Sequence, residues 1–237
     1  MHLKSILACL VLATTLSHAD SYQSGQHQVQ LLELYTSEGC SSCPPADHWL
    51  SRQQQHPGLW KQFVPVAFHV AYWDWIGWQD PYASEKYDKR QRTYASTGAV
   101  GNVYTPGFLL NGREWRGFFQ HERTLPKALK RDVGNLQLTI DGKQFEASFN
   151  GEKAQQLHIA ILGMELTSQV TKGENRNKTL KHDFVVIGFG SYPMSAGKWH
   201  GRLPMLMHES ERYGIAAWVT DGKSQQPIQA LGGGYAP

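Results

Sequence analysis

The chain has 237 residues, which suits two compact domains at roughly 100–200 residues each. Hydrophobic residues make up 41% of the chain and charged residues 18%, so it can bury a sizeable core and lacks the composition of a disordered tail. The formal net charge of +3 is too weak and too dispersed for a charge-driven nucleic-acid binder. Beyond residue 20, no stretch approaches the ~20 apolar residues of a membrane span. Composition therefore argues against a nucleic-acid-binding protein and against an integral membrane protein.

The N-terminus has the three parts of an export signal. Lys4 supplies a positive charge, Ile6–Leu16 forms a short apolar run, and Ser17-His18-Ala19 offers a small-residue cleavage site. The apolar run is too short for a membrane anchor. We therefore predict that residues 1–19 are a signal peptide and that the mature protein is exported, either periplasmic or secreted.

Residues 20–133 alternate the patterns of strand and helix. The run 29–35 is apolar with a single interior acid, as expected for a strand covered on both faces, and Pro44-Pro45 favours the first turn of a helix. The expected order is strand 29–35, a helix from Pro44, strand 63–70, helix 83–97, strand 107–110, strand 114–117 and helix 124–133. This order is typical of a small α/β sheet domain.

From residue 134 the pattern changes to short β segments with Gly-, Asn- and Lys-rich turns between them. Strands are expected over 136–140, 144–149, 157–164, 166–170, 184–189, 215–219 and 228–231. The polar stretch 172–181 indicates an exposed loop. Residues 134–237 are therefore predicted to form an all-β, sandwich-like domain behind the α/β domain.

The cysteines give the strongest functional signal. Removal of the signal peptide also removes Cys9, which leaves Cys40 and Cys43 as the cysteines of the mature chain. A CxxC pair fits a redox dithiol, half of a zinc site or a structural bridge. A four-ligand zinc site needs a second Cys or His pair at matching spacing, and the mature chain has none. An inert bridge, and a partial copper site formed by both thiolates and His69, stay open as alternatives.

The setting of the CxxC pair favours redox chemistry. A predicted strand ends before the turn at Gly39 and a predicted helix begins around Cys43, which would place Cys40 at a helix N-terminus. There the peptide dipoles and free N–H groups stabilise a thiolate. We expect Cys40 to be the exposed attacking sulfur and Cys43 the buried resolving sulfur. A bridge that closes so small a loop removes little entropy from the unfolded chain, so stability is a weak reason for the pair.

Glu33 is a candidate catalytic acid, because it lies within an apolar run upstream of Cys40. A carboxylate held in an apolar environment gains affinity for a proton and can exchange that proton with the resolving cysteine. The alternative is an acid at a strand edge that points into solvent.

Aromatic residues crowd the segment that follows the predicted strand 63–70. Loops at that end of an open α/β sheet lie on the active-site side, and aromatic side chains offer large contact areas to a protein or peptide substrate. The alternative is a small core that covers the sheet edge. His69 is flanked by apolar residues and is expected to be a buried core histidine, and Asp80 a turn residue. The candidate substrate-binding residues of this segment are Tyr72, Trp73, Trp75 and Trp78.

The Thr105-Pro106 step lies just before a predicted strand. This arrangement resembles the thioredoxin superfamily, in which a Thr-Pro or similar step with a cis peptide bond lies against the CxxC and offers backbone groups to an extended chain. A cis bond is accessible there because a proline follows. The resemblance implies that Thr105 and Pro106 flank Cys40 and bind substrate, and that an acid placed like Glu33 exchanges the proton of the resolving cysteine. A trans proline that opens the strand is the alternative.

A longer stretch makes the resemblance more specific. The run Glu33–Asp47, ELYTSEGCSSCPPAD, is similar to the signature of a secreted thioredoxin-like family known as domain of unknown function 1223. The similarity continues through His69–Pro81, Arg90–Arg92, Val103–Asn111 and, in the second half, Gly173–Asn175 with Thr179-Leu180. It implies a thioredoxin-like fold for residues 20–133 and carries no established substrate.

These features predict an exported thiol–disulfide oxidoreductase that acts on protein or peptide disulfides and exchanges electrons with a redox partner protein. Cys40, Cys43 and Glu33 are the expected catalytic residues. No motif for an organic cofactor is present, and no metal is assigned to the site. The alternative function is a non-enzymatic thioredoxin-fold binding module whose CxxC is a structural bridge or holds a metal such as copper.

Overall fold

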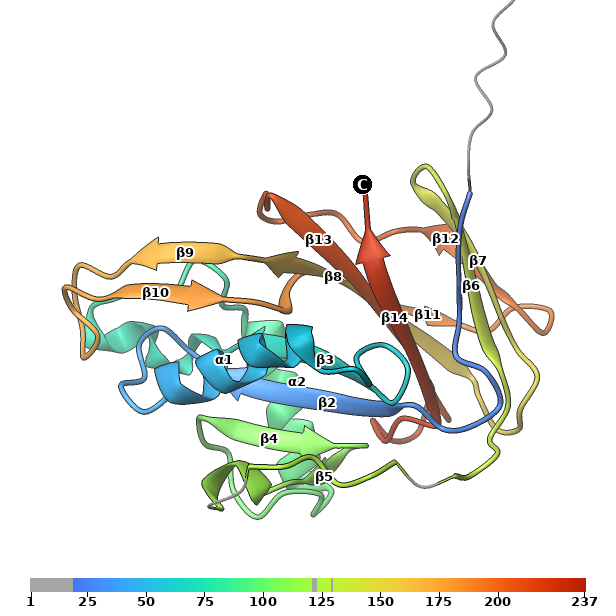
Figure 1. The fold of residues 1–237 in the computed structure, drawn as a ribbon, viewed down its shortest axis with the longest axis horizontal. Coiled ribbons are helices and arrows are strands. Elements are labelled where there is room, and N and C mark those ends of the chain that lie inside the picture. Colours follow the sequence, from blue (N-terminus) through green and yellow to red (C-terminus); the bar gives the residue numbers. More distant parts are fainter. Residues whose placement is uncertain (1–18, 121–122, 129) are drawn as a thin grey trace, which may run out of the picture.

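The computed structural model of the protein describes residues 19–120, 123–128 and 130–237 (Figure 1). The predicted signal peptide over 1–19 lies outside the described residues, apart from Ala19. No helix within the described ranges has the length and apolar character needed to cross a membrane.

An eight-stranded sheet takes strands from both halves of the chain. β2 and β3 pair in parallel along their whole length, and β3 continues the sheet through a parallel pairing of Ala67 with Val185. A backbone hydrogen bond of 2.8 Å from Ala67 N to Phe184 O reinforces this junction. The strand order is β14 (Gln229–Tyr235), β13 (Arg212–Thr220), β8 (Gln156–Met164), β11 (Val185–Pro193), β3 (Phe63–His69), β2 (Gln30–Thr36), β4 (Gly107–Leu110) and β5 (Arg113–Glu114).

Two smaller sheets lie at opposite ends of the large one (Figure 1). In β6, buried and exposed residues alternate, as expected for a strand with one face on a core. The β9–β10 hairpin, at the other end, lies beside α1. The sheets are β1 (Asp20–Gln23), β6 (Leu136–Asp141), β7 (Gln144–Phe149) and β12 (Trp199–Arg202), and the hairpin of β9 (Leu166–Gln169) and β10 (Thr179–His182).

The α-helices of the described residues contact opposite faces of β2. Glu33 forms an ion pair with Arg90 of α2, whereas the side chain of Thr36 interacts with Asp47 of α1. Positions three apart on a strand point to opposite faces, so α1 and α2 lie on either side of the sheet (Figure 1). The helical elements are α1 (Pro44–Ser51), η1 (Arg52–Gln55), η2 (Ala71–Ile76), α2 (Glu85–Ser96) and η3 (Gly117–Phe119).

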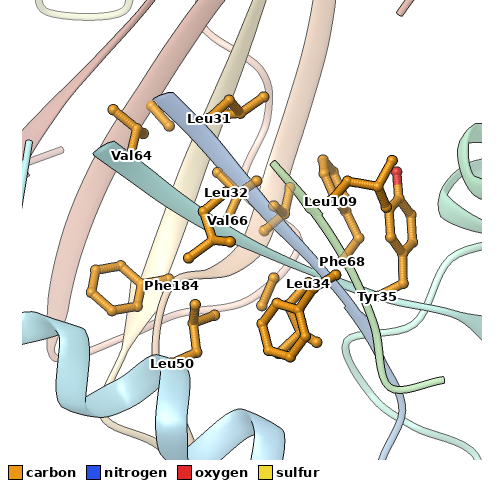
Figure 2. Packing of buried hydrophobic residues seen from close by; sticks show 14 of the residues in the cluster. Leu31, Leu32, Leu34, Tyr35, Leu50, Val64, Val66, Phe68, Leu109 and Phe184 are labelled. Atoms are coloured by element: carbon orange, nitrogen blue, oxygen red, sulfur yellow. The ribbon is translucent and has the colours of Figure 1, made fainter. Parts of the chain in front are cut away.

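The main hydrophobic core joins residues from both halves of the chain. Leu34 and Val66 come from the first half, and Phe184 and Trp218 from the second, and all four are fully buried in one cluster. Leu50 of α1 and Phe184 pack in this cluster beside β2 and β3 (Figure 2). Because apolar surface from both halves leaves water together, the two halves stabilise each other.

The predicted fold class, an α/β thioredoxin-like domain followed by an all-β sandwich-like domain, is wrong. The described residues are mainly β, with three sheets and short helices. β3 shares its second edge with β11, so the strands after residue 134 extend the first sheet. Local hydrophobicity shows that a strand is buried, but register and partner depend on contacts distant in sequence. The pattern of residues 20–133 therefore gave no sign of this continuation.

Most predicted strands are confirmed with shifted ends, and the helix predicted over 83–97 is confirmed as Glu85–Ser96. The helix predicted over 124–133 is wrong, since residues 123–128 and 130–133 contain none. Its C-terminal part runs as extended chain, where Gln28 N donates to Arg131 O at 2.8 Å and His27 pairs with Asp132. The sequence prediction missed β1, β10 and β12.

Candidate redox site

The CxxC turn lies where β2 leads into α1. Cys40 and Cys43 form a disulfide with their Cα atoms 5.4 Å apart, and Cys43 is the N-cap residue of α1. Ser41 and Ser42 are exposed, whereas Cys40 and Cys43 are 1% and 0% exposed. The cysteines therefore have the predicted place at the start of a helix, but Cys40 is covered rather than exposed.

Trp73 of η2 connects the CxxC turn to the Thr105-Pro106 step. A Cβ atom on Gly39 would lie 2.9 Å from the Cβ of Trp73, so this close approach requires glycine. Trp73 Nε1 donates to Thr105 Oγ1 at 2.8 Å. The Thr105–Pro106 peptide bond is cis, which confirms the expectation from the resemblance. Trp73 therefore lies between the Thr105-Pro106 step and Gly39, the residue before Cys40.

The other predicted substrate-binding aromatics differ in their surroundings. Trp78 Nε1 donates to Glu38 Oε2 at 2.8 Å, and the Tyr72 hydroxyl donates to Gln91 Oε1 at 3.1 Å. Both side chains are half-buried. Trp75, in contrast, is 81% exposed. The segment therefore combines a small core around the CxxC turn with one tryptophan that projects into solvent.

The segment 170–178 between β9 and β10, which we call the cap loop, covers the CxxC turn. Asn175 is fully buried, and its Nδ2 donates to Glu38 O at 2.8 Å and to Cys40 O at 3.0 Å. Ser41 N donates to Glu174 Oε2 at 3.1 Å. The polar stretch 172–181, which we expected to be an exposed loop, is exposed along most of its length. Two of its residues, Glu174 and Asn175, nevertheless form hydrogen bonds with the backbone of the CxxC turn.

Five buried ionisable side chains, the acid–histidine cluster, lie beside α1 and the CxxC turn. His69 Nδ1 lies 2.7 Å from Asp80 Oδ2, and the His69 and His182 rings are 5.0 Å apart. His182 Nε2 lies 3.1 Å from Glu38 Oε1, and its Nδ1 lies 3.8 Å from Asp47 Oδ2. Elements from both halves of the chain supply this cluster. Its members are Glu38, Asp47, His69, Asp80 and His182.

Electrostatic interactions give the cluster members different proton affinities. Burial alone lowers the pKa of His69, but Asp80 and the more distant Asp47 and Glu38 outweigh it and raise this pKa to about 9. Burial favours a higher pKa for Asp80, yet His69 lowers it. Burial raises the pKa of Asp47, although His182 and His69 oppose the shift. His69 and Asp80 therefore form an ion pair at neutral pH, and Asp47 is the acid with increased proton affinity.

A surface pocket of about 300 Å³ reaches this cluster from solvent, and Asp47, His182, His48 and Lys181 are among its lining residues. The facing atoms of the pair, Asp47 Oδ2 and His182 Nδ1, are themselves buried beneath the wall of this pocket. Among the side chains the structure describes, no group of three or more His, Cys, Asp or Glu has the geometry to hold a metal ion.

Glu33 lies on the other face of β2, away from α1. Its Oε2 accepts from Arg90 Nε at 2.9 Å and from the Tyr35 hydroxyl at 3.1 Å, and its Oε1 accepts from the Tyr94 hydroxyl at 2.6 Å. The residue is fully buried, so it is not the solvent-facing edge acid of the alternative. These hydrogen bonds connect β2 to α2, and the structure does not bring Glu33 to the acid–histidine cluster.

Sequence reasoning missed Glu38, Asp47, His182, Glu174 and Asn175 as members of the site. Glu38 and Asp47 flank the cysteines within the signature run 33–47, and Glu174 and Asn175 lie in the looser C-terminal block of the resemblance. Their position in those blocks could have marked them as candidate site residues. His182 had no such indication in the sequence, because the pairing of β10 with β9 brings it to the cluster.

Two solved structures are similar in fold to this chain. Protein AGR_C_4864 from Agrobacterium tumefaciens, known from an X-ray crystal structure, is 25% identical in sequence with a TM-score of 0.60, covering 88% of this chain and 95% of its own. HBP35 of Porphyromonas gingivalis is 10% identical with a TM-score of 0.52, covering 89% of this chain and 76% of its own, which supports similarity of fold alone. None of the curated proteins compared with the chain matches it.

A family model described as "Protein of unknown function (DUF1223)" matches residues 31–220. The matched segment runs from β2 to the end of β13 and contains the CxxC turn, the cap loop and the whole acid–histidine cluster. The chain therefore belongs to the DUF1223 family.

Proposed function

We propose that this protein is an exported thiol–disulfide oxidoreductase that acts on protein or peptide disulfides. The observation that carries the proposal is the Cys40–Cys43 disulfide at the start of α1, with the buried acid–histidine cluster beside it. Free N–H groups at a helix start favour a thiolate, and a buried acid with raised proton affinity can exchange the second thiol proton. Export is inferred from the predicted signal peptide over residues 1–19.

In the reducing direction, the Cys40 thiolate attacks one sulfur of a substrate disulfide. A Cys40–substrate bond forms, the substrate S–S bond breaks, and the leaving sulfur departs as a thiolate that takes a proton from water. Cys43 then loses its proton and attacks the Cys40 sulfur, which forms the intramolecular disulfide and releases the second substrate thiolate. The two protein thiols are oxidised and the substrate disulfide is reduced to two thiols. A dithiol partner protein restores the protein thiols by the same exchange, and the reverse sequence oxidises substrate thiols.

Asp47 replaces Glu33 in our proposal as the proton acceptor for Cys43. It lies four residues after Cys43, and positions four apart lie on the same face of a helix. Its raised pKa and its position in the wall of the surface pocket suit a group that accepts one proton and returns it. His182, 3.8 Å away, stabilises the charged form of Asp47.

The substrate is proposed to bind as an extended chain across the Thr105-Pro106 step. Trp73 joins that step to the CxxC turn, and the exposed Trp75 offers an aromatic contact beyond it. Tyr72 and Trp78 support this surface through their hydrogen bonds. Because Cys40 is 1% exposed, sulfur exchange also requires a local movement that exposes its sulfur.

Turnover of a protein disulfide tests the proposal. Wild-type protein should accelerate the reduction of insulin by dithiothreitol, and Cys40→Ser should return the rate to background. Cys43→Ser should accumulate a mixed disulfide with a substrate peptide, detected as an adduct by mass spectrometry. Equal rates for wild type and Cys40→Ser would remove the enzymatic proposal. A reduction potential below about −300 mV would mark the bridge as structural.

A further inference from the structure

The cap loop places one neutral and one charged side chain on the backbone of the CxxC turn. Asn175 is buried and donates to the carbonyl oxygens of Cys40 and Glu38. Glu174 is exposed, and its carboxylate accepts the N–H of Ser41 at 3.1 Å. Gly173 has a φ of +72°, a conformation that suits glycine, and it brings the loop against the side chains of Ile76 and Trp78. The loop is thus held in place by contacts that do not depend on the charge of Glu174.

The Glu174 carboxylate is close enough to influence the sulfur of Cys40. Ser41 N follows Cys40 directly, and four covalent bonds separate it from Cys40 Sγ, so the carboxylate oxygen lies within roughly 8 Å of that sulfur. Hydrogen bonds from the side chain and backbone of Ser41 lower the pKa of Glu174, which is therefore ionised at neutral pH. A negative charge at this distance destabilises a thiolate and has little effect on an uncharged disulfide.

Glu174 also occupies a donor that a thiolate could use. N–H groups at a helix start lack partners within the helix, and such groups stabilise the N-terminal thiolate of a CxxC pair. Two other charged groups near the turn have their own hydrogen-bond partners: Lys178 Nζ donates to Asn175 Oδ1, and Glu38 is bound by Trp78 and His182. Within the described residues, Glu174 is the acid bonded to the backbone between the two cysteines.

We propose that Glu174 is a positioning residue that keeps the Cys40–Cys43 couple reducing. Its charge, and its hold on the Ser41 N–H, destabilise the Cys40 thiolate relative to the disulfide. Reduction would place two negative charges near each other, so it would also weaken the contact between the cap loop and the turn. The inference rests on the proposed function, because the reduction potential of Cys40–Cys43 matters only if the pair alternates between disulfide and dithiol.

The test compares Glu174→Gln with wild type, using the fully reduced protein and glutathione redox buffers. Glutamine can still accept the Ser41 N–H, so the variant removes the charge and keeps the shape. The ratio of Cys40 thiolate to thiol at a given pH, followed by ultraviolet thiolate absorbance, should rise about three- to tenfold. At a pH above the Cys40 pKa of both proteins, the equilibrium constant against glutathione should shift by the same factor toward the reduced protein, which corresponds to about 15–30 mV. Both shifts should diminish at high salt, because Glu174 is exposed.

Glu152→Gln is the matched control, since it removes an exposed acid from the turn between β7 and β8. Asn175→Ala loosens the cap loop without changing the charge. It should therefore speed alkylation of Cys40, with little shift in the pH midpoint of the Cys40 thiolate titration. An unchanged midpoint and equilibrium constant in Glu174→Gln, or equal shifts in Glu152→Gln, would overturn the inference. The thiolate titration needs no turnover, so a failed insulin assay with an intact Glu174 effect would count against the proposed function alone.

Discussion

The Asp47 carboxylate and the His182 imidazole lie 3.8 Å apart beside the CxxC turn, although they belong to α1 and β10, in different halves of the chain. Both side chains are nearly buried, at 6% and 2% exposed. A histidine that faces a buried acid reduces the energetic cost of charging that acid. The pair therefore joins the second half of the chain to the segment that holds the cysteines.

Asp47→Asn should lower the activity of the protein without lowering its stability. Burial raises the pKa of Asp47, so its charged form weakens the folded state as pH rises, and removal of the carboxylate should leave the unfolding free energy at neutral pH unchanged or higher. Loss of the proton acceptor should lower kcat/KM for insulin reduction about 10²-fold. Rates measured across a pH series, with urea unfolding of the same samples, check both expectations. A variant that is destabilised and retains full activity per folded molecule would contradict the proposed role.

The His69–Asp80 ion pair predicts stability that falls at alkaline pH. The folded-state pKa of His69 is about 9 against 6.5 in the unfolded chain, so the contribution is complete below about pH 6.5 and is lost as pH rises through 9. The linked free energy is about 2–4 kcal/mol. Urea unfolding at intervals between about pH 6 and about pH 10 measures it. His69→Asn should be less stable at pH 6 and should lack this alkaline slope; parallel slopes in both proteins would disprove the ion pair.

The Glu33–Arg90 pair is expected to be structural. Arg90 is buried, its Nε lies 2.9 Å from Glu33 Oε2, and its guanidinium packs against Phe68 and Trp218. Arg90→Met should leave a buried carboxylate without its charge partner and should cost about 3–5 kcal/mol of unfolding free energy. The double variant with Glu33→Gln should recover much of that loss. Denaturant unfolding of the single and double variants completes the cycle, and additive losses would contradict coupling between the two residues.

Trp75→Ala should weaken substrate binding without weakening the fold. Trp75 is 81% exposed, so its removal should leave the melting temperature unchanged. If it contacts protein substrates, KM for insulin should rise about 5–30-fold, as for loss of a ~1–2 kcal/mol interface contact. Glutathione disulfide lacks the longer chain that this contact would hold, so it should be reduced at the wild-type rate. Phe119→Ala, which removes a 50% exposed aromatic, is the control; an equal KM change there would make the effect nonspecific.

The elements close to the cysteines were predictable because their signals are local. The apolar run of β2, the prolines that open α1 and the Ser84 cap of α2 act within a few residues. The cis bond at Thr105-Pro106 was expected from the resemblance, since a proline makes it accessible. Strand β10 was missed because most of its residues lie within the polar stretch 172–181, although Leu180 and His182 alternate as buried positions.

Glu33 shows why the surroundings of a buried acid could not be predicted from the sequence. It was an acid in a buried strand near Cys40, and burial is correct. The side-chain period of a strand is two, so its direction depends on which face receives each helix. Asp47 and Thr36 meet on the α1 side, while Glu33 points to Arg90 and Tyr94 on the α2 side.

The sequence by itself determined that two cysteines stand at a strand-to-helix turn, and which family signature surrounds them. Only the tertiary structure decided what covers the disulfide and which acid lies beside it. The cap loop and His182 arrive through the β9–β10 hairpin, and the sheet that positions that hairpin is continuous from β2 to β14. Contacts of this kind depend on strand pairing between distant segments, and hydrophobic periodicity records burial without recording the partner.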